Sequence, residues 1–138
     1  MYVRVNSIGI LGMSSFGVGV EASLDNGMPR FDVVGLPDTA VSESKERVRS
    51  AMKNCGFKYP PSRITVNLTP ADIKKDGPVY DLPILIALLI TSGQLECNIK
   101  YSAFIGELSL SEVSLSHAEE GKKRGKNERY SKDFRKLF

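Results

Sequence analysis

Alternating apolar and polar positions dominate the first part of the chain. Residues 2–6 alternate, and residues 16–24 do so as well. A period of two places every second side chain on the same face of a strand. The pattern therefore predicts two half-buried strands. The polar face of the second carries Gly17 and Gly19, where we expect a neighbouring backbone to approach closely. Its apolar face would hold Phe16, Val18, Val20, Ala22 and Leu24.

A reverse turn is predicted at Asp25-Asn26-Gly27, because Asn-Gly tolerates the positive φ angles of primed turns. Residues 30–34 are then expected to return as the antiparallel partner of residues 16–24. Two later strands are predicted at 63–68 and 103–110, since both segments alternate. The inward residues of the first of these are Ile64, Val66 and Leu68.

Helical spacing replaces alternation after the turn at 35–37. Asp38 is predicted to cap this helix, because its carboxylate can accept from the free amides of the first turn. Glu43 and Arg47 are expected to pair on the solvent face, four residues apart, and Gly56 to end the helix. The apolar stripe would consist of Val41, Ser44, Val48, Ala51, Met52 and Cys55.

Residues 82–90 are apolar on every side, which predicts a second helix that lies in the core. Asp81 is expected to cap it, Pro83 is tolerated in its first turn, and Gly93 would end it. The resulting order is three strands, helix, strand, helix and strand. This order predicts an α/β (α+β) fold, a mixed sheet with an antiparallel hairpin and two main helices.

Charge divides the chain into two parts. The 138 residues are 41% apolar, which suits one domain with a real core, and the net charge is +3. Residues 117–138 hold eight basic and four acidic side chains, so the excess lies there. We predict a folded domain over 1–115 and a basic, flexible tail over 116–138. Candidate nucleic-acid contacts in that tail are Lys122, Lys123, Arg124 and Lys126.

The sequence shows no signal for a membrane or for export. The apolar run at 82–90 is far shorter than the roughly 20 residues that a span needs, and residues 2–6 do not resemble a signal peptide. Cys55 and Cys97 are expected to be free thiols. These features favour a cytoplasmic protein.

Glycine-rich motifs offer little chemistry. Gly17-x-Gly19-x-x-Ala22 fits the dinucleotide fingerprint in letters only, because the pattern there is a strand and not a helix start. Gly121 to Asn127 mimics part of a phosphate loop but lacks the Ser or Thr after Lys126 that would hold magnesium. Lys75-Asp76-Gly77-Pro78 could present amides to an anion, and spacing favours a tight turn before a helix. The chain is therefore expected to bind no ATP.

No acid/base pair or activated nucleophile is evident. Nothing places two of Asp72, Asp76 and Asp81 on one helical face, so turn and cap roles are favoured. Ser42 and Ser44 have no histidine within reach along the sequence and are expected to be solvated. Two further residues, Arg63 and Asn67, could touch a partner or lie on the surface.

Five segments resemble one family. They are Asn26-Gly27-x-Pro29, Val34 to Arg49, Arg63 to Leu68, Pro70-Ala71-Asp72 and Tyr80 to Ile84. Together they are similar to the N-terminal domain of the magnesium-chelatase-like AAA+ ATPases, the ComM/YifB competence-protein group. The resemblance implies a ribosomal-S5-domain-2-like fold, related to the proteolytic domain of Lon. It also implies a bacterial, ring-forming ATPase whose motor domain follows and which drives branch migration of DNA.

Within that resemblance, ATP and magnesium belong to the motor domain, and this chain would hold no cofactor or metal. Expected partners are AAA+ ring neighbours or a second copy of the chain, with DNA in the full-length context and no membrane. Candidate interaction and turn residues are Asp38, Arg47, Arg49, Arg63, Asn67, Lys75, Asp76 and Asp81.

The chain departs from the related sequences at two places. Lon-type peptidases carry a nucleophilic Ser after Lys-Asp-Gly-Pro, where this chain has Val79. The family continues after Gly106 to Leu110 with another strand, a helix and the motor, whereas this chain enters its basic segment, as a truncated, frame-shifted or decayed copy would. The favoured interpretation is a non-catalytic accessory domain. The alternatives are a degenerate Lon-like Ser-Lys peptidase, a nucleic-acid-binding module that acts through the tail, and a remnant without function.

Overall fold

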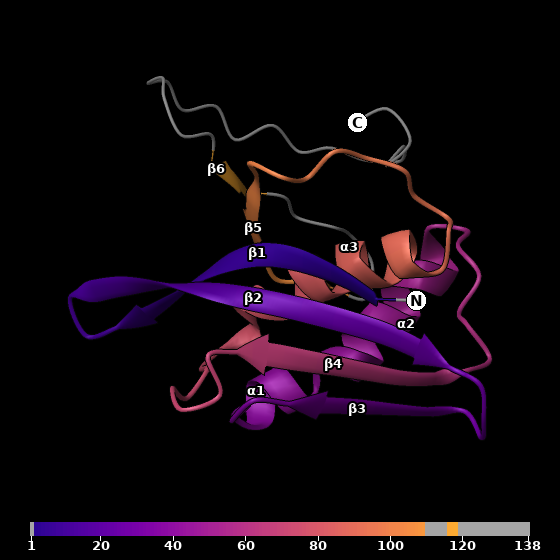
Figure 1. The fold of residues 1–138 in the computed structure, drawn as a ribbon, viewed down its shortest axis with the longest axis horizontal. Coiled ribbons are helices and arrows are strands. Elements are labelled where there is room, and N and C mark those ends of the chain that lie inside the picture. The colour runs from indigo at the N-terminus through magenta and orange to yellow at the C-terminus, as the bar shows by residue number, and fades with distance from the viewer. Residues whose placement is uncertain (1, 110–115, 119–138) are drawn as a thin grey trace.

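A computed structural model describes residues 2–109 and 116–118. Its core is a two-layer arrangement in which a mixed sheet carries the helices on one face (Figure 1). In the described residues the sheet has six strands in the order β3-β4-β2-β1-β5-β6. The strands are β1 (Tyr2–Leu11), β2 (Ser14–Asp25), β3 (Arg30–Val34), β4 (Arg63–Thr69), β5 (Ala103–Ile105) and β6 (Ser116–Ala118). The predicted α/β fold with a mixed sheet and two main helices is confirmed.

The antiparallel hairpin is formed by β1 and β2, which pair along their whole length from Tyr2↔Ser23 to Leu11↔Ser14. β4 pairs antiparallel with β2, β3 and β5 pair parallel with β4 and β1, and β6 pairs antiparallel with β5. Strand β6 lies within the segment predicted as a tail, and the rest of that segment lies outside the described residues.

The predicted pairing of residues 30–34 with residues 16–24 is wrong. The turn at Asn26-Gly27 does reverse the chain, and Gly27 has a φ of 146°. However, β4 is inserted between β2 and β3, with Val66 opposite Ala22 on one side and Val33 on the other. A parallel pair requires a crossover connection. The helices between β3 and β4 provide this crossover. The insertion of β4 between β2 and β3 depends on residues far along the chain, so the turn sequence carries no local signal for it.

The first predicted helix is divided in two, α1 (Thr39–Ser42) and α2 (Ser44–Asn54), with Glu43 between them. Its predicted stripe is buried except for Cys55, which is exposed. Cys55 occupies the C-cap position of α2, beyond the last turn packed on the core, and the chain turns away at Gly56 with a φ of 78°. The predicted stop at Gly56 is thus confirmed.

Helix α3 (Asp81–Thr91) follows a short 3₁₀ turn, η1 (Pro78–Tyr80), and every residue from Asp81 to Leu89 is buried. The predicted core helix is confirmed, as is the inward orientation of Ile64, Val66 and Leu68. In the described part of the chain, no helix is both long enough and apolar enough to cross a bilayer.

Strand β5 is shorter than the predicted 103–110. The backbone leaves the sheet at Gly106, whose amide donates to the carbonyl of Val79 and whose carbonyl accepts from the amide of Leu82. These bonds tie the chain to the beginning of α3 instead of to β1. They also bring Leu108 to a buried carboxylate, which is central to the candidate site.

Candidate functional site

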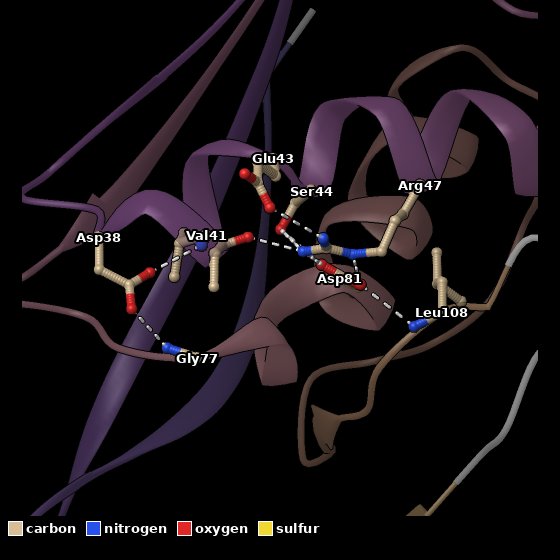
Figure 2. Close-up of polar contacts among 9 residues, drawn as sticks. Asp38, Val41, Glu43, Ser44, Arg47, Gly77, Asp81 and Leu108 are labelled. Carbon is tan, nitrogen blue, oxygen red and sulfur yellow. Dashed lines mark hydrogen bonds and ion pairs between the residues drawn. The ribbon is translucent and has the colours of Figure 1, made fainter.

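A buried carboxylate joins the two main helices behind the sheet. The Asp81 side chain has no exposed surface. It accepts from Oγ of Ser44 at 2.5 Å, from Nε of Arg47 at 2.6 Å and from the backbone amide of Leu108 at 3.1 Å (Figure 2). A buried carboxylate is tolerated when its oxygens are paired in this way. We call these four residues the Asp81 cluster; it holds α2, α3 and the segment after β5 together.

The predicted cap role of Asp81 is wrong. Tyr80 occupies the N-cap position of α3 and makes no side-chain cap bond, and Asp81 is the first helical residue. Its carboxylate faces α2, where a guanidinium offers charge-assisted hydrogen bonds that are stronger than those of backbone amides. Partners from a distant helix cannot be read from local spacing.

Arg47 is likewise not a solvent-face residue. Its side chain is 20% exposed and points at Asp81, while its Nη1 lies 3.9 Å from Oε2 of Glu43, so the predicted pair exists as a long contact. The hydrogen bond to Asp81 raises the pKa of Arg47, and partial burial acts in the opposite direction. Nη2 also donates to the carbonyl of Ala40 at 2.6 Å, which ties α2 to α1.

Ser44 is fully buried, so the expectation that it is solvated is wrong. Its hydroxyl donates to Asp81 and lies 3.4 Å from Nη2 of Arg47. The apolar stripe of the sequence did contain a signal for this position, because a serine on the buried face of a helix needs a polar partner.

A second set of contacts lies at the start of α1. Asp38 is the N-cap, as predicted, and its Oδ1 accepts from the amide of Val41 at 2.7 Å. Its Oδ2 accepts from the amide of Gly77 at 3.0 Å (Figure 2). The Gly77 amide, which could have bound an external anion, is therefore already bonded to the carboxylate of Asp38 in the same domain. The preferred interpretation of residues 75–78, a turn that leads to a helix, is consistent with this arrangement.

Lys75 is a buried lysine that holds backbone carbonyls. Its Nζ donates to the carbonyl of Gly35 at 2.9 Å and to the carbonyl of Pro70, and its amide donates to the carbonyl of Leu36 at 3.0 Å. Burial lowers the pKa of Lys75, and Asp72 acts in the opposite direction. Lys75 therefore fixes the turn before α1 to the loop before α3.

Replacing Asp81 by asparagine should lower the free energy of unfolding by about 3–5 kcal/mol, because the Arg47 guanidinium would lose its buried counter-charge. Urea denaturation of the purified chain followed by circular dichroism measures this loss. Asp76→Asn is the matched control: Asp76 is exposed and its Oδ1 lies 3.5 Å from Nζ of Lys74. That substitution should cost less than about 1 kcal/mol. Equal losses in the two variants would contradict a stabilising role for Asp81.

The remaining predicted residues do not join these contacts. The Arg49 guanidinium lies over the ring of Tyr59, 5.0 Å from its centroid. Arg63 is exposed at the start of β4, and Asn67 donates to Glu21 at 2.9 Å on the outer face of the sheet. Asp72 and Asp76 are at the surface and Asp81 is in the core, so they form no acid/base pair. The four tail residues Lys122, Lys123, Arg124 and Lys126 lie outside the described residues.

The arrangement offers no group that is poised for chemistry in the described residues. Val79 is 37% exposed just before α3, and its aliphatic side chain cannot attack a carbonyl. The Ser44 hydroxyl is committed to Asp81 inside the core. Among residues 2–109 and 116–118, no group of three or more His, Cys, Asp or Glu side chains could hold a metal ion.

Comparison with known proteins agrees with the motifs. A family model described as subunit ChlI of Mg-chelatase matches residues 20–119. This range includes every residue of the Asp81 cluster, as well as Asp38 and Lys75. The chain belongs to the magnesium-chelatase-like ComM/YifB family.

Two relatives define the extent of the likeness. A protein named YifB from Escherichia coli is 41% identical over 136 residues, which is 94% of this chain and 27% of the relative. Competence protein ComM of Haemophilus influenzae is 48% identical over 101 residues, which is 72% of this chain and 20% of the relative. The chain corresponds to the N-terminal region of the family and spans about a quarter of the length of the curated relatives that it matches.

Proposed function

We propose that this chain is a non-catalytic accessory domain of the ComM/YifB family. One observation carries the proposal: the polar groups that could have performed chemistry are bonded within the domain. Asp81 and Ser44 bond to each other, Asp38 bonds to Gly77, and Lys75 bonds to backbone carbonyls. Side chains that are bonded in this way fix the shape of a domain, which supports a structural role for these four residues.

In the larger family protein, this rigid domain would contribute contacts to the assembly. ATP and magnesium would bind in the part of the family protein beyond the matched quarter, in the cytoplasm of a bacterium. DNA would be handled by the complete assembly, in keeping with the name of the competence relative. The share of the relatives that the chain covers supports this division of roles, because three quarters of their length lies elsewhere.

A domain exchange tests the proposal. The N-terminal region of the Haemophilus influenzae relative would be deleted and then replaced by residues 2–109 of this chain, and assembly would be followed by sedimentation velocity. We expect the deletion to impair assembly and the exchange to restore it, while an exchange that carries Asp81→Asn restores it less well. Full assembly without any N-terminal region would contradict the accessory role.

The peptidase alternative predicts a different result. The purified chain should not cleave a fluorogenic peptide above the rate of a blank, because Val79 cannot serve as a nucleophile. Cleavage that is abolished by Lys75→Ala, in a variant that circular dichroism shows to be folded, would favour a Lon-like peptidase over the accessory role.

A further inference from the structure

Charge is unevenly distributed over the domain. Residues 2–109 hold eleven basic and eleven acidic side chains, so their net charge is zero. Residues 44–62, which comprise α2 and the loop that leads to β4, hold five basic side chains and one acidic side chain. This segment therefore has a net charge of +4, and the rest of residues 2–109 has a net charge of −4. A separation of this size marks a surface that attracts anions.

Three of these cations form a stripe along α2. Lys45, Arg49 and Lys53 follow one another at intervals of four residues, and all three are exposed. Each step turns by about 40° and rises by about 6 Å, so the three lie within an arc of about 80° over roughly 12 Å of helix. The buried residues of α2 lie on a different side of the helix, so the cations face solvent. We call these three residues the α2 stripe.

The cations of the α2 stripe are not engaged by carboxylates. Among the described residues, neither Lys45 nor Lys53 takes part in a salt bridge, in contrast to Arg47, which is bound to Asp81. The Arg49 guanidinium lies over the Tyr59 ring, 5.0 Å from its centroid. A guanidinium that stacks on a ring keeps N–H groups at its edge, where they can donate to a phosphate. The stripe therefore offers positive charge and hydrogen-bond donors to a ligand outside the domain.

The composition of the exposed side of α2 favours a nucleic acid over a protein as this ligand. None of the exposed residues of α2 is apolar, whereas the core of a protein interface is apolar and poor in lysine. Interfaces with nucleic acids are polar and positively charged. Glu46, the one acidic residue of residues 44–62, lies at the edge of the arc, about 100° from Lys45.

The length of the α2 stripe also suits a phosphate backbone. One strand of a DNA duplex carries a phosphate for about every 3.4 Å of helix axis, so a stripe of roughly 12 Å runs beside three or four phosphates. Contacts of this kind hold the backbone and carry no sequence information. We infer that the α2 stripe binds the phosphate backbone of a nucleic acid without reading its sequence.

Fluorescence anisotropy of the full chain with a labelled DNA duplex of random sequence, over a salt series, tests this inference. Each phosphate contact contributes about −0.9 to the slope of the logarithm of the association constant against the logarithm of the salt concentration. The triple variant Lys45→Gln, Arg49→Gln and Lys53→Gln should make this slope shallower by roughly 2.7 and weaken binding in 0.1 M salt by at least about tenfold. Glutamine keeps the helix propensity of the replaced residues, so circular dichroism should show a folded variant.

A matched control removes the same charge elsewhere. Arg30, Lys74 and Lys100 are exposed cations outside α2, and replacing all three by glutamine should change the slope by less than about 1. The basic residues beyond residue 118 are unchanged in both triple variants, so their contribution cancels in the comparison. The charge-preserving variant Lys45→Arg with Lys53→Arg should bind the duplex as the wild type does.

Three results would overturn the inference. They are a wild type that does not bind the duplex, equal changes of slope in the two triple variants, and a stripe variant that loses binding to a polyglutamate peptide but not to the duplex. The last result would assign the α2 stripe to an acidic protein. The accessory role does not depend on this contact and would survive any of them.

Discussion

Replacing Leu88 by aspartate should leave the chain unfolded at room temperature. Leu88 has no exposed surface and lies in the middle of α3, among residues that are all buried. Removing its side chain alone would cost about 2–5 kcal/mol, and an unpaired carboxylate in the core adds a further penalty. The total approaches or exceeds the 5–15 kcal/mol by which domains are typically stable. Circular dichroism and a thermal melt would show the loss of the cooperative transition.

Two companion variants separate burial from charge. Leu88→Ala should remain folded with a reduced free energy of unfolding, because it leaves a cavity without a charge. Met28→Asp introduces the same charge at an exposed position and should change stability by less than about 0.5 kcal/mol. An unchanged melting temperature for Leu88→Asp would show that α3 does not lie in the core.

Replacing Gly35 by valine should be nearly as damaging, for a backbone reason. Gly35 has a φ of 100°, which side-chain-bearing residues rarely adopt. A Cβ there would also lie 2.1 Å from the carbonyl oxygen of Leu68, a backbone atom of β4. Neither group can move without breaking the contact between the turn before α1 and β4. We expect a loss of more than about 3 kcal/mol in urea denaturation, well above the usual effect of one substitution.

A pair of alanine variants isolates the two causes at Gly35. Gly56→Ala carries only backbone strain, because Gly56 has a φ of 78° and nothing within 4 Å of its Cβ position. It should cost about 1 kcal/mol. Gly35→Ala adds the collision with Leu68 and should cost clearly more. Equal costs would show that β4 gives way and that the close approach does not require glycine.

These expectations describe a domain whose internal polar contacts set its shape. The Asp81 cluster fixes the distance between α2, α3 and the segment after β5, while Lys75 fixes the turns before α1 and α3. Removing any of these contacts should therefore lower the free energy of unfolding of the domain. This is the behaviour of a scaffold, and it is the reason why the accessory role is the function that the geometry supports best.

Local pattern determined the elements of this protein. Alternation marked β2 and β4, the all-apolar run marked α3, and Asp38 and Gly56 marked the two ends of the α1–α2 segment. Such signals are contained within a few residues, because strand and helix periodicity and capping depend on neighbours along the chain. The family motifs were readable for the same reason, since they lie in continuous segments.

Only the tertiary structure decided how distant segments meet. It placed β4 between β2 and β3, and it turned Asp81 from an apparent helix cap into the buried partner of Ser44 and Arg47. It also showed that Gly35 lies against the backbone of Leu68, and that the β1–β2 hairpin extends past the end of β4. Strand order and the pairing of buried charges depend on contacts between residues far apart in sequence. Many arrangements of such contacts satisfy one hydrophobic pattern, so the pattern alone does not select among them.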